Sequence, residues 1–350
     1  MASVNRDIPS ILECFENSLD LARQQLLENT PERDSANFDL NRFWTNFSGA
    51  IKLVSHEATK FCMAFDEEAI SSSKACQSLI DKVEKTCIAL LAVFTTLPKA
   101  KGKVFYKNVH TYTLDILQGM KNLCSAIRNQ SSTRLQIVGE IWEKCQAVEQ
   151  LPSSIFKCDF NFLQSSLDNR DAVLVIFRDQ HDMVQDASQE LVESLENEDV
   201  GPPFELTLVE PLNGLQIPPT EGWSSSDRNV LLPCSGLVKA LKACIKKTMQ
   251  AISERGDGSN EACINELDTI VEIVKSSSSI ADDFVLSLYP PMNHSAVREQ
   301  ATLVRNLSKD ILSSVKNSHF STAVDDRWIE FLEKAVDHNW VRISDMALAD

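Results

Sequence analysis

The spacing of apolar residues constrains this chain more than any other feature of its sequence. Apolar side chains recur at intervals of three and four over nearly the whole length, and strict alternation over the length of a strand is nearly absent. A three-and-four period places these side chains on one face of a helix, where they can be buried together. The pattern predicts an all-α protein. One such face comprises Phe47, Ile51, Val54, Ala58, Phe61 and Phe65.

Glycine is scarce, which supports the same prediction. Only 10 of 350 residues are glycine, roughly 3% against an average of about 7%. Several predicted helices have about 25–28 residues and would be about 40 Å long, and long helices with short connections pack as antiparallel neighbours. We expect helices over residues 4–28, 39–66, 72–97, 102–128, 132–150, 168–197, 226–254, 259–289, 292–317 and 325–347.

Two stretches without helical spacing divide the chain. Residues 152–166 contain aromatic residues but no apolar face, and residues 198–226 contain five prolines and three glycines, a composition typical of a long loop. A chain of 350 residues has room for two buried cores. We therefore predict two up-and-down bundles of long antiparallel helices. The first would cover residues 1–160, with about five helices, and the second residues 161–350, with a loop at 198–226.

Charge and cysteine usage narrow the class of protein. The formal net charge is −16, whereas proteins that bind nucleic acid carry a basic face. No signal peptide is visible, and the longest apolar run, CIALLAVFTTL, has 11 residues, too few to span a membrane. The ten cysteines form no Cys-x-x-Cys pair, and most lie on apolar helix faces. This usage indicates small buried side chains in a reducing compartment.

The sequence contains little that suggests catalysis. The segment HEATK at 56–60 resembles the start of a zinc-protease motif, but Lys60 stands where the second metal-binding histidine would be. We interpret His56 and Glu57 as ordinary polar residues on a helix surface. Neither a Gly-x-Ser-x-Gly turn nor a glycine-rich phosphate loop is present. A cysteine–histidine pair stays open, because such partners meet only in the folded chain. We predict no enzyme, cofactor or metal.

The stretch SLYPPMNHSAVR, residues 287–298, interrupts the helical pattern with two prolines. Pro290 pushes the preceding residue away from helical dihedrals, and Pro291 has no N–H group to donate. We expect a helix to stop near Tyr289 and a new one to begin at an Asn293 cap. Two interpretations stay open. The stretch is a fixed corner between helices, or it is a partner-docking site that uses Tyr289, Pro290, Pro291 and Met292.

A group of lysines forms the second candidate contact. Lys239, Lys242 and Lys246 are three and four residues apart and share a helix face, with Lys247 beside them. The same segment carries an apolar face, so the lysines fit the solvated back of a core helix. The alternative is a patch that binds an acidic partner.

Five segments, in order along nearly the whole chain, resemble the cyclin-D-binding protein family, also called GCIP. The segments are RFWTNFSGAIKLVSHEATKF (42–61), TLDILQGM (113–120), SGLVKALKACIKK (235–247), DDFVLSLYPPMNHSAVR (282–298) and WIEFLEKAVDHNWVRI (328–343). The most specific parts are SHEAT, in the first segment, and LSLYPPM, in the fourth.

The resemblance implies an all-helical protein with bundle domains of the vinculin and catenin type and no catalytic activity. It also implies D-type cyclins and helix-loop-helix transcription factors as partners. Members are negative regulators of cell-cycle progression and transcription in nucleus and cytoplasm. This sequence has no basic region and no leucine repeat at seven-residue spacing, so we expect no direct nucleic-acid binding. Because no apolar run is long enough to span a membrane, we also expect no membrane partner. The alternative is a cytoskeletal or adhesion adaptor, because bundles of this shape also bind actin.

Overall fold

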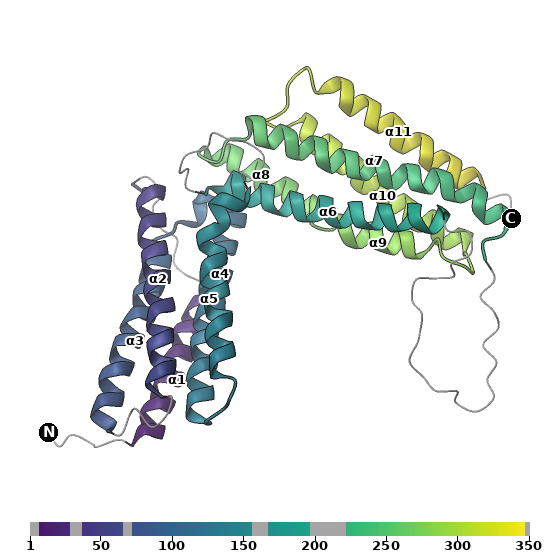
Figure 1. The fold of residues 1–350 in the computed structure, drawn as a ribbon. Coiled ribbons are helices and arrows are strands. Elements are labelled where there is room, and N and C mark those ends of the chain that lie inside the picture. The colour runs from purple at the N-terminus through teal and green to yellow at the C-terminus, as the bar shows by residue number, and fades with distance from the viewer. Residues whose placement is uncertain (1–6, 29–36, 66–71, 156–166, 197–221, 347–350) are drawn as a thin grey trace, which may run out of the picture. The chain divides into compact units, whose positions relative to one another are not determined.

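The prediction of an all-α protein is confirmed. The computed structural model describes residues 7–28, 37–65, 72–155, 167–196 and 222–346, and this part of the chain contains helices and no strand. The structure divides into two units, residues 1–172 and 173–350 (Figure 1). The domain boundary that we predicted at residue 160 lies outside the described residues.

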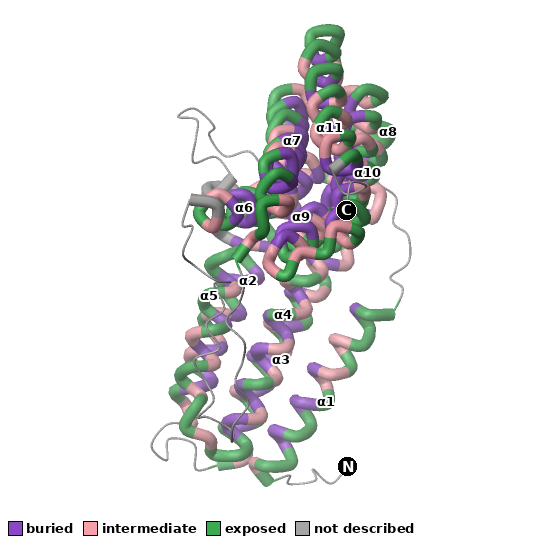
Figure 2. Tube along the Cα trace, turned by 90° about the vertical axis from the view of Figure 1, so that its right-hand side faces the viewer, coloured by how far each residue is buried: buried purple, intermediate pink, exposed green. Residues whose placement is uncertain are grey.

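The first unit is a bundle in which the long helices form a closed ring. Helix α1 packs on α3 and α4, α2 packs on α3 and α5, and α4 packs on α5. Figure 2 shows that buried positions recur along each helix rather than covering it, as the three-and-four spacing predicts. The elements are α1 (Ile8–Leu27), α2 (Leu40–Ala64), α3 (Ser73–Phe94), the short 3-10 helix η1 (Lys99–Lys101), α4 (Lys103–Arg128) and α5 (Arg134–Ile155).

The apolar face predicted for residues 47–65 forms the inner side of α2. Phe47, Val54 and Phe61 are fully buried, and Phe65, just beyond the last turn, is half-buried. The indole of Trp44 donates a hydrogen bond of 2.8 Å to the carbonyl oxygen of Leu167. The segment before α6 is therefore attached to the first unit.

The start of α4 is capped by a residue far away in the sequence. Its N-cap is Gly102, which has a φ of 120° and no side chain to accept a hydrogen bond. Instead, the side-chain oxygen of Asn169 accepts the buried N–H of Phe105 at 3.0 Å. A Cβ at Gly102 would lie 2.0 Å from the Asn169 side chain. Both the dihedral and the close approach therefore require glycine.

The second unit contains the later helices, and α6 crosses from one unit to the other. Helix α7 packs on both α10 and α11, these two pack on each other, and α10 also contacts α8 and α9. The chain enters α7 through a capping box, in which Ser224 and Asp227 bond reciprocally. The helices are α6 (Asn169–Glu196), α7 (Ser225–Arg255), α8 (Glu261–Val274), α9 (Ser277–Leu286), α10 (His294–Lys316) and α11 (Asp326–Met346).

One helix prediction is wrong in a way that has a clear cause. The single helix expected over 259–289 is two helices, α8 and α9, separated at Lys275 and Ser276. The hydroxyl of Ser276 bonds back to the carbonyl oxygen of Ile273, and Gln180 on α6 accepts the N–H of Ser278 at 2.9 Å. These bonds replace those of a continuous helix. Gln180, which interrupts the apolar face of α6, thereby caps α9.

The predicted loop at 198–226 is described only at its end. Residues 198–221 lie outside the described part of the structure, and Ser225 and Ser226 already belong to α7. Among the described helices, none is sufficiently long and apolar to cross a membrane.

Candidate interaction surfaces

The two prolines occupy a corner between α9 and α10. Helix α9 ends at Leu286, three residues before Tyr289, and α10 begins at His294. The peptide bond between Pro290 and Pro291 is cis. The side chain of Asn293 accepts the N–H of Ala296, which confirms the predicted asparagine cap.

The side chain of Tyr289 is directed to α6. Its hydroxyl donates a hydrogen bond of 2.8 Å to the Glu190 carboxylate and lies 3.3 Å from the Ser194 hydroxyl. Burial raises the pKa of Tyr289, and the neighbouring Glu190 carboxylate adds to the rise. The phenol therefore stays protonated and connects the corner to α6. Pro291 is exposed, and Met292 is half-buried.

Two further contacts fix this corner to the start of α7. The indole of Trp223 donates to the carbonyl oxygen of Leu288 at 2.7 Å, and His294 lies 2.7 Å from the Asp227 carboxylate. Burial alone would raise the pKa of Asp227, but hydrogen bonds from His294 and Ser224 hold it below its usual value. These contacts support the fixed corner. Partner docking at Tyr289, Pro290, Pro291 and Met292 stays a prediction.

The predicted lysine group lies on the outer side of α7. Lys239 and Lys246 are exposed and Lys242 is half-buried, whereas Leu241 and Ile245 between them are buried. None of the three ammonium groups forms an ion pair within the described part of the chain. Both interpretations of this group stay open. It is a solvated helix surface or a contact for an acidic partner.

The residues that resemble a zinc-protease motif have ordinary surroundings. The carboxylate of Glu57 pairs with Lys60 at 2.9 Å, and His56 is exposed on the outer side of α2. No group of three or more histidine, cysteine or acidic side chains that could hold a metal ion occurs among the described residues. The Glu57–Lys60 pair is an i, i+3 contact typical of a helix surface.

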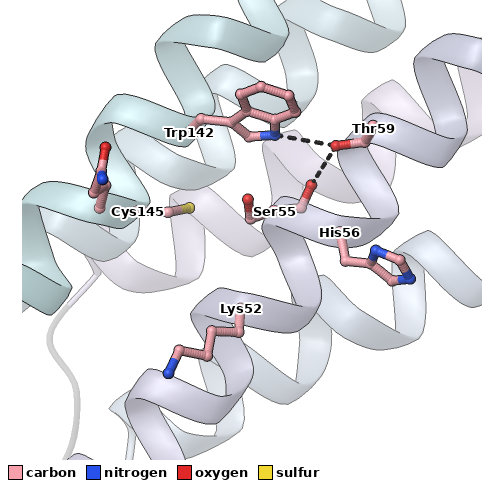
Figure 3. Close-up of a pocket in the computed structure, with 7 residues that line it drawn as sticks. Lys52, Ser55, His56, Thr59, Trp142 and Cys145 are labelled. Atoms are coloured by element: carbon pink, nitrogen blue, oxygen red, sulfur yellow. Dashed lines mark hydrogen bonds between the residues drawn. The ribbon is translucent and has the colours of Figure 1, made fainter.

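A groove lies beside these residues, between α2 and α5. Its volume is about 430 Å³, and it is lined by Lys52, Ser55, His56, Thr59, Trp142, Cys145 and Gln146 (Figure 3). The indole N–H of Trp142 donates to the Thr59 hydroxyl oxygen at 3.0 Å, and the same hydroxyl donates to the backbone oxygen of Ser55. The groove therefore has one aromatic wall whose orientation is fixed by a hydrogen bond to the facing helix.

The cysteine in the groove does not form a catalytic pair with the histidine. Cys145 is buried, and Figure 3 shows the His56 imidazole directed away from its thiol. Elsewhere in the protein, burial raises the pKa of the Cys87 and Cys244 thiols to about 12. Thiols of that kind are poor nucleophiles at neutral pH. Among the residues that line the groove, the imidazole and the thiol are therefore not paired with each other.

Trp142 is a groove residue that was not predicted from the sequence. The buried positions of α5 include Val138, Ile141, Cys145 and Val148, and Trp142, next to Ile141, lies at the edge of this face. A large aromatic residue just outside an apolar face is a usable signal for a contact site. Its location opposite Thr59 could not be read from the sequence, since that requires knowing that α2 and α5 are neighbours.

Comparison with known proteins gives a consistent result along the chain. The family model described as Grap2 and cyclin-D-interacting, N-terminal, matches residues 46–197, and the corresponding C-terminal model matches residues 218–313. The Cyclin-D1-binding protein 1 homolog of Xenopus laevis is 33% identical over 308 residues, covering 86% of this chain and 88% of that protein. Cyclin-D1-binding protein 1 of Homo sapiens is 30% identical over 331 residues, covering 89% and 86%.

Proposed function

Because the chain belongs to the Grap2 and cyclin-D-interacting family, we propose that it is a non-catalytic interaction protein that binds D-type cyclins. The observation that carries this proposal is the match to relatives named for cyclin D1 binding, which extends over most of both chains. Both family models match, in order, across the two units.

The structure is compatible with binding rather than chemistry. Its described helices present apolar faces to two cores and leave a groove with an exposed aromatic wall between α2 and α5. Surfaces of this kind accept partner side chains, and tryptophan is enriched among the residues that dominate binding energies.

A titration of the purified full chain with a D-type cyclin tests the proposal. We expect saturable heat in isothermal calorimetry with a Kd of about 10 μM or tighter. Co-sedimentation with actin filaments is the parallel measurement for the adaptor alternative. No heat with the cyclin, together with specific pelleting with actin, would replace the proposal by that alternative.

We further propose that the protein restrains cell-cycle progression and transcription, in nucleus and cytoplasm, by sequestering helix-loop-helix factors. An amphipathic helix bound in a groove can no longer use its apolar face to dimerise on DNA. Adding the chain to a helix-loop-helix dimer on labelled DNA should release the DNA as the chain concentration rises. A DNA complex that persists at saturating chain would contradict sequestration, and a tagged chain absent from nuclei would contradict the nuclear role.

A further inference from the structure

We propose that the groove between α2 and α5 is the docking site for one amphipathic helix of the protein partner. Apolar side chains of that helix would cover Trp142, and a carboxylate would meet Lys52. The inference rests on the proposed function, because it locates the surface through which a protein partner is bound. It is carried by the shape of the groove, by its exposed apolar residues and by its charge.

The groove has the shape that a helix needs. Two contacts show that α2 and α5 run antiparallel. Arg134, at the start of α5, donates to the backbone oxygen of Phe65 at the end of α2, and Trp142 bonds to Thr59 one to two turns further along. The seam between two such helices is a straight furrow, and a third helix packs into a furrow of this kind at an interaxial distance of about 8–10 Å.

Trp142 gives the groove its principal contact. Its side chain is 48% exposed, although its N–H is already bonded to Thr59. The part of the indole that faces solvent is therefore its apolar surface, and the hydrogen bond holds it in one orientation. A fixed, half-exposed indole whose polar group is satisfied favours apolar side chains of a partner over polar ones.

Two more exposed apolar side chains extend this surface toward the end of α2. Met63 is 65% exposed and Leu135 is 69% exposed. Met63 is four residues after Thr59, and Leu135 is seven residues before Trp142, so each shares a helix face with a groove residue. The contact between Arg134 and Phe65 brings these two ends together. The apolar part of the surface thus continues from the groove over Met63 and Leu135.

Lys52 marks the opposite end of the groove. It is exposed and forms no ion pair within the described part of the chain, although the chain carries a net charge of −16. Met63 lies eleven positions after Lys52 on α2, which is about 16 Å or three turns of helix. A matching partner helix carries apolar side chains over one to two turns and an Asp or Glu about 10 or 11 residues away.

The net negative charge of the chain argues against a second copy of this chain as the occupant of the groove. Two copies that each carry a net charge of −16 repel one another, and this repulsion weakens association between them. A partner helix with one or two acidic side chains aligned on Lys52 makes a local attraction instead. The occupant is therefore a helix from a different protein.

The test measures binding of a D-type cyclin to the full chain and to four variants. We expect Trp142→Ala to weaken binding at least about tenfold, in line with truncation of a central aromatic contact. Met63→Glu should weaken binding by a similar factor. Lys52→Glu should weaken it about three- to tenfold, with a smaller salt dependence than the wild type. The matched control is Lys85→Glu, a charge reversal at an exposed lysine on α3, which should bind as the wild type does.

The outcomes separate this inference from the proposed function. If the wild-type chain binds the cyclin and Trp142→Ala, Met63→Glu and Lys52→Glu bind it equally well, the groove is not the docking site and the proposed function stands. If the wild-type chain does not bind, the proposed function fails and the inference fails with it. Self-association of the wild type in sedimentation, lost in Trp142→Ala, would identify a second copy as the occupant and overturn the inference. Circular dichroism of each variant verifies folding, which we expect to be retained because all four changed side chains are exposed.

Discussion

The two units are built from the same amphipathic helix pattern, but their helix ends are held in different ways. In the first unit aromatic rings pack on one another. Phe43 and Phe47 stack with centroids 5.4 Å apart, and the Trp44 ring lies 5.8 Å from that of Phe105. These contacts depend on apolar burial and ring geometry, so their strength does not change with protonation.

In the second unit charged side chains bind backbone and side-chain groups at the ends of the helices. The carboxylate of Asp325 accepts hydrogen bonds from the N–H and hydroxyl of Thr322 and from the Trp328 indole, and it pairs with Arg255 at 2.9 Å. His319 accepts the N–H of Asp257 at its Nε2, so its Nδ1 carries the proton donated to Glu266. Helices with the same amphipathic pattern can therefore have their ends held by pH-independent or by pH-dependent contacts.

Acidification should produce a larger difference in stability between the two units than any single substitution. Burial would raise the pKa values of Asp227, Glu266, Asp325 and Asp337, but hydrogen bonds hold all four below their usual values, and nearby positive charges add to this at Asp325 and Asp337. The folded state then binds fewer protons than the unfolded state, so stability falls as pH falls, between about pH 5 and pH 2.

Hydrogen exchange of the full chain, corrected for intrinsic rates, measures this difference. We expect protection in α7, α10 and α11 to decline at a higher pH than protection in α2 and α4. Burial raises the pKa of Asp168 in the first unit, so the contribution of this group to stability increases as pH falls. Burial also raises the pKa values of Asp179 and Asp282, which offsets part of the loss of stability in the second unit. Equal decline in both units would contradict the comparison.

The substitution Asp325→Ala should have the next largest effect. It leaves the Trp328 and Thr322 donors without their acceptor and removes one of the two carboxylates that pair with Arg255, and Asp325 itself is buried. We expect a loss of about 3 kcal/mol in the free energy of unfolding of the second unit. Urea denaturation followed by tryptophan fluorescence gives this value. Asp326→Ala, one residue later and exposed, is the control and should cost less than about 0.5 kcal/mol.

Two glycine substitutions should have the smallest effects on the free energy of unfolding. They test how closely neighbouring helices approach each other in each unit. A Cβ at Gly119 on α4 would lie 2.8 Å from Ile141, a fully buried branched side chain on α5. A Cβ at Gly236 on α7 would lie 2.4 Å from the end of the Asn339 side chain on α11, which is half-buried.

We expect Gly119→Ala to cost about 2 kcal/mol, because neither helix can yield without moving the core. Gly236→Ala should cost less than about 1 kcal/mol, since an amide at a surface can rotate away and alanine favours the helix. Thermal unfolding of the two variants gives both values. A larger cost at Gly236 would show that α7 and α11 are the more rigid pair.

Most of the fold could be predicted from the sequence because helical spacing is a local property. The prolines and the Asn293 cap were also readable, since each restricts its own backbone. The break at Ser276 was not, because apolar positions continue in register on both sides and Gln180 contributes from another helix. The groove at Trp142 was not predicted either, because it depends on which two helices are neighbours.

The capping of α4 by Asn169 determines how this protein can be cut into fragments. A fragment that stops at residue 160, where the sequence suggests a boundary, loses both the Leu167 oxygen that binds Trp44 and the Asn169 oxygen that binds Phe105. A fragment that begins at residue 173 starts inside α6 and lacks its first turn. Either half expressed alone would therefore lack native contacts at its cut end. An N-terminal fragment should include the beginning of α6.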